Sequence, residues 1–520
     1  MKRSPGTASP PPPRRRTDAA AGAMVTAIAF DPHARTPLHR QLYDAIRGAI
    51  VAGRLRPGAR MPSTRYLSEQ LDLARNTVLN VFEQLLAEGY LVARPGSATF
   101  VADELPDRAL RAARRVQGHD IKAPHPPSAT ETGVGLSRRG RELADGPIWA
   151  RVPPRVPGAE VAFRPGLPAL DAFPFERWGR LLARRWNRSG ADLYDHGDPR
   201  GYGPLREALA EYLAAARGVR CDVGQILITT GTQQATGLAA AVLLDPGAAA
   251  WVEDPGYPFA RAALTAAGAA LVPVPVDDEG IDVAEGIRRR RDARLAVVTP
   301  AHQFPLGHAM SPRRRDALLA WARDAGAWLV EDDYDSEFRY VGRPLAALQG
   351  EDPERVVYCG TFSKVLTPAL RLGYVVVPRR VVGAFLAAKV GADLRTPPLE
   401  QAVLADFIAG GHFARHVRRM RVLYARRQDA LLAAAGRFAP SLTLRPRPAG
   451  MQLICWLPEG MDDRAAADRV TRAGLQAFPL SGLRLEPSRA GGLILGYAPV
   501  PAERMADCVR RLHAAVVSGE

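Results

Sequence analysis

Apolar residues at helical spacing mark the first patterned region of the chain, which runs from about residue 31 to 102. Between Pro37 and Gly53 every fourth residue is apolar, and this spacing places the apolar side chains on one face of an amphipathic helix. The residues on that face are Leu38, Leu42, Ile46 and Ile50. We expect Gly53 to end the helix.

The rest of this region predicts two more helices and a hairpin. Ser63 is placed to cap a short helix whose Leu67 and Leu71 face inward. The run RNTVLNVFEQLLAEGY predicts a third helix that ends at Gly89. The segment YLVARPGSATFVA indicates two short strands around a turn at residues 94–96. Three helices followed by a hairpin are the arrangement of a winged helix-turn-helix, a small α+β fold. The buried face of the third helix would hold Val78, Phe82 and Leu85.

A winged helix-turn-helix inserts the start of its third helix into the major groove of DNA. There an arginine can bridge the acceptors of guanine, and an asparagine can pair with adenine. The alternative is that the arginines of this region are only solvated surface charges. The residues expected at a DNA surface are Ser63, Thr64, Arg65, Arg75, Asn76 and Thr77 from the helices, with Arg94 and Gly96 from the wing.

From about residue 160 onward, short apolar runs alternate with longer helical patterns, which is typical of a mostly parallel sheet wrapped by helices. The run ILITTGTQQATGLAAAVLL predicts a buried strand, a glycine turn and a helix that begins near Thr232. Such a helix N-terminus favours an anion. Further strands are predicted in RLAVVTP, AWLVEDDYDSEF and RVVYCG, with a helix opened by Ser311 and Pro312 and closed by Gly326.

The segment TFSKVLTPALRLGY follows the last of these strands and brings Lys364 and Arg371 to the carboxyl end of the sheet, where such folds bind ligands. A lysine that forms a Schiff base with an aldehyde needs a shielded pocket, and a pyridinium nitrogen needs a carboxylate beside it. Lys364, Asp332 and Arg371 supply an amine, a carboxylate and a cation. Alternatively, each of the three is a structural or surface residue.

Composition adds a partner class. The 520 residues are 47% hydrophobic, enough for more than one core, and Lys+Arg 70 against Asp+Glu 54 gives a net charge of +16. This balance favours a polyanionic partner such as nucleic acid, although biased base composition would also explain a surplus that is almost all arginine. The four cysteines lie far apart without nearby histidines, so we expect neither a disulfide framework nor a metal site.

The remaining segments predict a division of the chain into four parts. Residues 1–30 are rich in Pro, Ala and Arg and are expected to form a disordered arm without the apolar core of a signal peptide. No later run approaches a membrane span, which favours a cytoplasmic protein. We expect the winged helix-turn-helix in 31–102, a linker in 103–159 and the sheet-containing domain in 160–520.

Two longer stretches resemble known families. The stretch from PLHRQLYDAI to GSATFV is similar to the DNA-binding domain of GntR-type bacterial regulators, except for Ser97 in the wing. Residues from about 160 to 515 resemble fold-type I, pyridoxal-phosphate-dependent aminotransferases through YDHGDPRGYGPLREALAEYL, ITTGTQQA, VEDPGYP, TPAHQFPLG, VEDDYDSEF and GTFSKVLTPALRLGY. Together they resemble the MocR subfamily of transcriptional regulators, which implies an α/β domain with a smaller C-terminal α+β subdomain.

The resemblance implies roles for individual residues. Lys364 would be the lysine that bonds to pyridoxal phosphate, Asp332 the partner of its pyridine nitrogen, and Tyr334 the partner of its phenolic oxygen. Tyr257 would stack on the ring, and Tyr194 would reach the phosphate of a neighbouring subunit in a homodimer. The remaining phosphate-binding residues would be Gly231, Thr232, Gln233, Thr361, Ser363 and Arg371.

Three departures from the aminotransferase pattern bear on function. In GGLILGYA, Ile494 stands where the enzymes carry an arginine for the substrate carboxylate, and Arg484 and Arg489 are out of register. No arginine follows two residues after Tyr257, and His302 and Gln303 stand in a run, HQFPLG, where the enzymes carry Asn-Pro. The expected function is therefore a regulator that binds a double-stranded operator and senses pyridoxal phosphate or an amino-acid or amine effector. The alternatives are an active aminotransferase with a DNA-binding head, or a dimerisation platform without cofactor.

Overall fold

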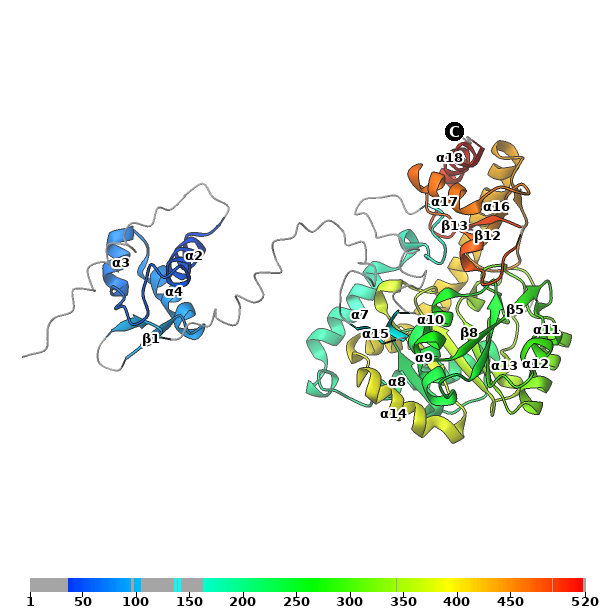
Figure 1. Ribbon diagram of the computed structural model, residues 1–520, viewed down its shortest axis with the longest axis horizontal. Coiled ribbons are helices and arrows are strands. Elements are labelled where there is room, and N and C mark those ends of the chain that lie inside the picture. Colours follow the sequence, from blue (N-terminus) through cyan, green and yellow to red (C-terminus); the bar gives the residue numbers. More distant parts are fainter. Residues whose placement is uncertain are drawn as a thin grey trace, which may run out of the picture. The chain divides into compact units, whose positions relative to one another are not determined.

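The computed structural model describes residues 36–94, 98–103, 135–137, 139–141, 162–342, 344–488 and 490–517. Contacts within the chain separate two compact units, residues 1–127 and 128–520, here called the head and the body (Figure 1). The arm expected in 1–30 and most of the linker expected in 103–159 lie outside the described residues.

The head has the predicted three helices and hairpin. The helices are α2 (Leu38–Val51), α3 (Thr64–Leu71) and α4 (Arg75–Ala87), and the strands β1 (Leu91–Ala93) and β2 (Thr99–Val101) pair antiparallel. The hydroxyl of Ser63 caps α3, since it accepts a hydrogen bond from the backbone N–H of Tyr66 at 3.2 Å.

The core of the head is built from the apolar stripes of its helices. Leu38 differs from the prediction because it is 41% exposed at the first position of α2. Gly53 and Gly89, the predicted helix ends, adopt φ of +74° and +78°, a region that favours glycine. The fully buried side chains include Leu42, Ile46, Ile50, Leu67, Val78, Phe82 and Leu85.

An eight-stranded sheet forms the centre of the body in the order β3-β10-β9-β8-β7-β4-β5-β6. Its middle strands, from β9 to β5, are parallel, whereas β10 and β6 pair antiparallel with their neighbours. The mostly parallel sheet is therefore confirmed. The strands are β3 (Ile226–Thr229), β4 (Ala249–Asp254), β5 (Ala270–Asp277), β6 (Gly280–Ile281), β7 (Leu295–Val298), β8 (Trp328–Asp333), β9 (Val356–Thr361) and β10 (Gly373–Val376).

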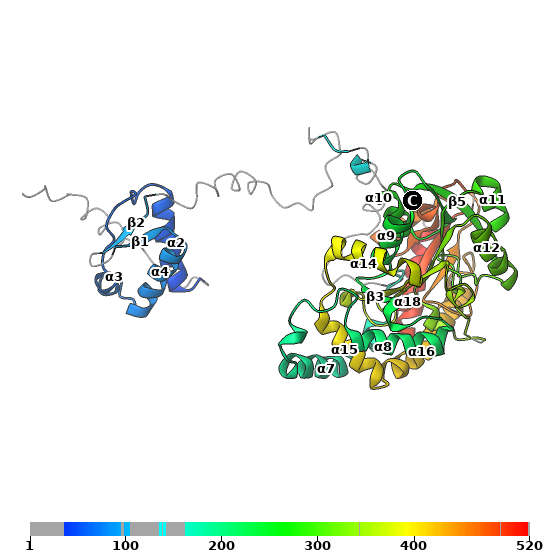
Figure 2. The same cartoon turned by 90° about the horizontal axis from the view of Figure 1, so that it is seen from below.

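Helices cover both faces of this sheet, because alternate residues of each strand point to opposite sides. Leu227 of β3 packs with the cluster under α9, while Ile226 and Ile228 pack with the opposite cluster. Figure 2 shows α9, α10 and α14 on one side of the body and α8, α15 and α16 on the other. The helices are α7 (Phe175–Arg188), α8 (Gly203–Arg217), α9 (Thr232–Leu243), α10 (Pro258–Ala266), α11 (Val283–Arg290), α12 (Pro312–Asp324), α13 (Leu348–Glu351), α14 (Val382–Asp393), α15 (Pro398–Ala409) and α16 (His412–Phe438).

A smaller C-terminal subdomain follows α16, as predicted. Its antiparallel sheet has the order β11-β12-β14-β13 and packs with α17 (Asp463–Arg472) and α18 (Met505–Val517). A bridge between Phe163 and Gly496 ties the segment that begins at residue 162 to this sheet. Among the described residues, no helix has the length and apolarity needed to cross a membrane. The strands are β11 (Thr443–Leu444), β12 (Gln452–Trp456), β13 (Phe478–Pro479) and β14 (Gly492–Gly496).

The separation of head and body predicts independent stability. Leu67 is fully buried in the head core, so Leu67→Ala should destabilise the head by about 2–5 kcal/mol. Hydrogen–deuterium exchange of the full chain, resolved by peptide, should show exchange in α3 and α4 accelerated roughly 30-fold or more. Leu79→Ala, which removes a side chain 41% exposed, is the matched control and should change exchange little. Equal acceleration in body peptides would contradict independent unfolding.

Candidate functional site

A cavity of about 280 Å³ lies at the carboxyl ends of β8 and β9 and the N-terminus of α9. It brings together residues from widely separated parts of the chain, including every predicted cofactor residue except Tyr194. The predicted residues that line it are Gly231, Thr232, Gln233, Tyr257, Asp332, Tyr334, Thr361, Ser363, Lys364 and Arg371.

Lys364 follows β9 and presents its amine inside this cavity. Its Nζ donates a hydrogen bond to the carbonyl oxygen of Gly166 at 2.9 Å. A Cβ at Gly166 would lie 2.7 Å from Nζ, and Gly166 has φ of +70°, so glycine is needed there. Burial lowers the pKa of Lys364, although the negative charges of Asp335 and Asp332 oppose that shift. A lowered pKa increases the share of neutral, nucleophilic amine.

Asp332 lines the cavity and has a carboxylate oxygen without a hydrogen-bond partner among the described residues. The residue is buried, and the unpartnered oxygen is Oδ1. Burial raises the pKa of Asp332 to about 7, and the neighbouring Asp333 adds to this effect. A buried acceptor without a donor is costly. The protonated nitrogen of a pyridine ring would supply the missing donor.

Tyr334 is held by a hydrogen-bonded group behind the cavity. Its hydroxyl lies 3.0 Å from Nδ1 of His302, and the same nitrogen lies 3.0 and 3.1 Å from the carboxylate oxygens of Asp335. Burial raises the pKa of Tyr334, which keeps the hydroxyl protonated. His302 and Gln303 are both buried and do not line the cavity, whereas Phe304 of the same run does.

Donors for an anion converge at the N-terminus of α9. Gly231 precedes this helix with φ of +130°, and a Cβ there would lie 3.9 Å from both terminal nitrogens of Arg371. The side chain of Arg371 has no hydrogen-bond or ion-pair partner within the described part of the chain. Free N–H groups, the helix dipole and a guanidinium together fit a phosphate. The cavity thus fits pyridoxal phosphate at its amine, its carboxylate and its anion end.

Aromatic side chains form another wall of the cavity. The ring of Tyr257 lies edge-on to that of Phe304, with centroids 5.5 Å apart. Burial raises the pKa of Tyr257 well above its usual range, so this side chain stays neutral. Phe304, Gly166 and Arg164 are lining residues that the sequence reasoning missed. Only Phe304 had a local signal, the Phe-Pro pair of HQFPLG.

Ile494 does not stand free at the cavity. It is buried on β14 in an apolar cluster with Leu306, Leu480 and Leu483. Arg484 is not among the lining residues, and Arg489 lies outside the described residues. Arg484 therefore does not replace the expected carboxylate-binding arginine in this structure.

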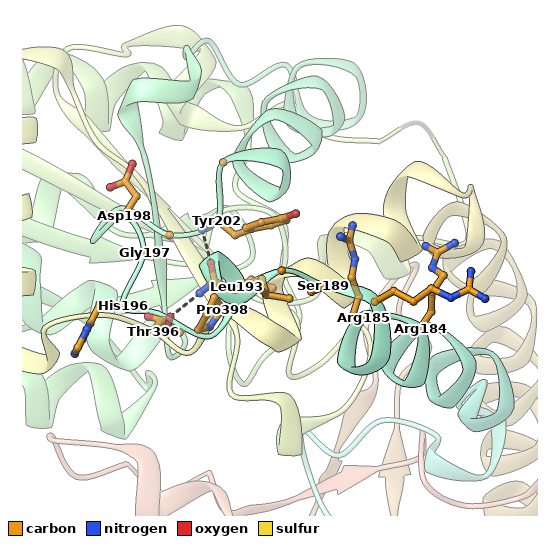
Figure 3. Close-up of a pocket in the computed structure, with 15 residues that line it drawn as sticks. Arg184, Arg185, Ser189, Leu193, His196, Gly197, Asp198, Tyr202, Thr396 and Pro398 are labelled. Carbon is orange, nitrogen blue, oxygen red and sulfur yellow. Dashed lines mark hydrogen bonds between the residues drawn. The ribbon is translucent and has the colours of Figure 1, made fainter.

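Tyr194 lies away from the cavity of its own chain. It is 48% exposed, and its hydroxyl donates to the carbonyl oxygen of Trp186 at 2.6 Å. A larger cavity of about 660 Å³ lies between α7, the following loop and the start of α15 (Figure 3). It contains none of the predicted cofactor residues, so we assign the chemistry to the smaller one. Polar residues lining the larger cavity include Arg184, Arg185, His196, Asp198, Thr396 and Gln401.

The head presents the predicted DNA residues in different states. Arg75 and Asn76 are exposed at the first turn of α4, and the side chain of Arg75 has no polar partner in the described residues. Arg65 pairs with Glu69 at 3.2 Å. Arg94 lies over the ring of Phe100, 4.7 Å from its centroid.

The other four predicted DNA residues are three helix residues and one residue of the wing. Ser63 is engaged in the cap of α3, and Thr64 and Thr77 stand at the first turns of α3 and α4. Gly96 and Ser97 of the wing lie outside the described residues.

Comparison with known proteins agrees with this division. Residues 38–101 match the family model of bacterial regulatory proteins of the gntR family, and residues 169–488 match that of aminotransferase class I and II. The chain is 40% identical to the probable rhizopine catabolism regulatory protein MocR of Rhizobium meliloti, over 95% of this chain and 96% of that protein. It is 31% identical to the pyridoxine biosynthesis transcriptional regulator PdxR of Corynebacterium glutamicum, over 90% and 94%.

A solved structure is similar to the body. LysN, the α-aminoadipate aminotransferase of Thermus thermophilus, complexed with N-(5'-phosphopyridoxyl)-L-leucine, superposes with a TM-score of 0.66. The identity is 29%, and the match covers 73% of this chain and 97% of that one.

The unsatisfied carboxylate predicts a pH-dependent stability change. The pKa of Asp332 is raised from 3.8 to about 7 in the folded protein. The protonated side chain is therefore favoured by folding, so its stabilising contribution is complete below about pH 4 and is lost as the pH rises through 7. In cofactor-free protein, Asp332→Asn should therefore raise the free energy of unfolding at pH 8 by about 1–4 kcal/mol, and by little at pH 4. Urea unfolding followed by tryptophan fluorescence measures the stability of the body, because all seven tryptophans lie in it, between Trp149 and Trp456.

The adjacent residue provides the control. Asp333 forms a buried ion pair with Arg217 at 2.7 Å, so Asp333→Asn should lower the stability by about 3–5 kcal/mol at neutral pH. If both substitutions stabilised the protein, or neither did, the predicted difference between the unpartnered Asp332 and the ion-paired Asp333 would be wrong.

Proposed function

The chain belongs to the MocR subfamily of GntR-type transcriptional regulators, and we propose that its body senses pyridoxal phosphate, or an amino compound that meets this cofactor, and thereby changes how its head binds an operator. The regulator binds DNA through the head, and its body binds pyridoxal phosphate. One observation carries the proposal: a single cavity joins Lys364, the unsatisfied Asp332 and the anion site at α9 in a chain whose head exposes Arg75. Because the head binds DNA, we propose that the protein acts in the cytoplasm.

We propose the following roles for the lining residues. Bound pyridoxal phosphate supplies an aldehyde that reacts with amines and a ring that withdraws electrons. Lys364 would hold it covalently, Asp332 would accept a hydrogen bond from the ring nitrogen, and Tyr334 would donate one to the phenolic oxygen. Tyr257 would pack against the ring. The phosphate would be bound by Gly231, Thr232, Gln233, Thr361, Ser363 and Arg371.

A homodimer is part of the proposal. The exposed Tyr194 lies edge-on to Trp186, which is 62% exposed, with ring centroids 5.7 Å apart, and Phe175 at the other end of α7 is 65% exposed. Exposed apolar patches of this kind mark interaction sites. We propose that a second copy covers this surface and the cavity of Figure 3, and that Tyr194 then reaches the phosphate site of the partner.

The burial of Ile494 favours a sensor over a working aminotransferase. Because β14 offers apolar side chains at this point, the strand supplies no cation for a substrate carboxylate. A ligand alters DNA affinity only by its differential affinity for two conformations. Since the linker expected in 103–159 is too long for a rigid lever, we propose that the signal passes by docking of the head on the dimeric body.

Replacement of Lys364 tests the proposed function. Lys364→Ala should abolish the absorbance band of the covalently held cofactor, whereas Lys122→Ala should keep it. Borohydride reduction and peptide mapping should place the cofactor on Lys364. Operator affinity of wild-type protein should differ by about 5- to 150-fold with and without the cofactor, and the variant should lose most of this response. An adduct on Lys389 would place the cofactor at another site. Equal operator affinities with and without the cofactor, combined with brisk multiple turnover, would favour the enzyme alternative.

A second prediction concerns the recognition helix. We propose that Arg75 reads a base, because it is exposed and unpaired at the first turn of α4, whereas Arg65 and Arg94 mostly contact the DNA backbone. Arg75→Ala should cost about 1–3 kcal/mol on a specific operator and relax the preference at one base pair. Arg65→Ala should instead weaken all sequences alike and reduce the salt dependence. Binding to specific and scrambled operators across a salt series separates the two, and equal losses for Arg75→Ala on both would refute base reading.

A further inference from the structure

Arg164 lines the cavity but has no role in the arrangement described so far. It is half-buried beside Lys364 and Asp332, and its side chain has no hydrogen-bond or ion-pair partner among the residues described. Several arginines buried in the body are instead neutralised by carboxylates. Such pairs are Arg217 with Asp333 at 2.7 Å, Arg314 with Asp277 at 2.7 Å and Arg427 with Asp171 at 2.5 Å.

The backbone around Arg164 is held at a conformational cost. The preceding residue, Phe163, is fully buried and adopts φ of +65°, a left-handed conformation that is unfavourable for a side chain with a Cβ. Its carbonyl oxygen accepts a hydrogen bond from the backbone N–H of Gly496 at 2.9 Å. A Cβ at Gly496 would lie 2.2 Å from the carbonyl oxygen of Arg164, so β14 must end in glycine for this segment to approach. Strain and close approach together position Arg164.

Arg164 therefore reaches the cavity beside the strand that lacks an arginine of its own. Ile494 lies two positions before Gly496 on β14 and is buried among apolar side chains. The nearby lining residues Phe304, Phe478 and Leu483 are also apolar. The cation that β14 does not supply is thus supplied from the other end of the body.

The two unpaired arginines of the cavity suit different anions. Arg371 faces the N-terminus of α9, where helix N–H groups add donors, and this combination fits a phosphate. Arg164 stands alone, and a single guanidinium matches the two oxygens of a carboxylate in a bidentate pair. Burial lowers the pKa of Lys364, and the charges of Arg164 and Arg371 contribute to that shift, which places Arg164 within electrostatic reach of the amine.

We propose that Arg164 binds the carboxylate of a small amino acid that enters the cavity next to Lys364, with its apolar part against Phe304, Phe478 and Leu483. The inference rests on the proposed function, because it assumes that pyridoxal phosphate occupies the rest of the cavity. Arg164 is the specificity-determining residue for a carboxylate-bearing effector. Amines of the same size without the carboxylate are then weak ligands.

Matched pairs of ligands test this role. Cofactor-loaded protein is titrated by calorimetry with L-leucine and 3-methylbutylamine, L-alanine and ethylamine, and 4-aminobutyrate and propylamine, each pair differing by one carboxylate. Wild-type protein should bind the acid of at least one pair 10-fold or more tighter than the amine. In Arg164→Gln this ratio should fall to about one, with the affinity for the amine and the absorbance of the bound cofactor unchanged. Arg164→Lys should restore part of the preference.

Arg484→Gln is the matched control, since Arg484 does not line the cavity, and it should keep the wild-type ratio. Loss of the preference in Arg484→Gln but not in Arg164→Gln would overturn the assignment, as would the absence of any acid preference in wild-type protein. Absence of the cofactor band in wild-type protein would overturn the proposed function itself, and the inference with it. The two failures are therefore distinguishable.

Discussion

Burial of charge at the carboxyl edge of the central sheet is the constraint on which the body depends. Removing an ionised group from water costs several kcal/mol unless partners replace the lost hydration. Two of the strands that meet at this edge, β4 and β8, end in acidic residues, and the helices packed over the sheet exclude water. The buried carboxyl groups there are Glu253, Asp254, Glu331, Asp332, Asp333 and Asp335, and Asp254 accepts hydrogen bonds from the backbone N–H groups of Leu485 and Glu486.

Each of these carboxylates but one has a partner within the described chain. Asp333 is paired with Arg217, Asp335 with His302, and Glu331 accepts hydrogen bonds from two backbone N–H groups. Glu253 accepts hydrogen bonds from Thr299 and Gln303. The remaining one, Asp332, has an oxygen without a donor and faces a cavity that also contains a shielded amine. Oδ1 of Asp333 also lacks a hydrogen-bond partner, but Asp333 does not line the cavity, whereas Asp332 does. An unsatisfied carboxylate in a lining position thus marks the binding site without reference to any relative.

Local sequence patterns predicted the residues that follow the strands of the central sheet, but not the residues that line the cavity from distant parts of the chain. The carboxylates at the end of β8, the lysine after β9 and the glycine before α9 each follow from a strand and its next turn, so their convergence at one edge was predictable. Arg164 and Gly166 were missed because they reach Lys364 through a bridge to β14, which joins distant parts of the sequence and has no periodicity. The place of Tyr194 depends on a second chain, which no pattern within one chain describes. In the head, the apolar spacing predicted that Leu38 would be buried, but it is exposed because it is the first residue of α2.

The free-energy cost of burying polar groups without partners at this edge of the sheet links ligand binding to the conformation of the body. A ligand that binds only the folded form stabilises it by RT ln(1 + [L]/Kd), about 2.7 kcal/mol when its concentration is 100 times Kd. Within the described residues Oδ1 of Asp332 and the guanidinium of Arg371 have no partner, and Nζ of Lys364 has only the carbonyl oxygen of Gly166, so a ligand in the cavity would supply partners that the chain does not. The same differential affinity sets an upper limit on how far DNA binding can change. Groups that are costly to bury without ligand are therefore what a sensor of this fold requires, whether or not it also turns over a substrate.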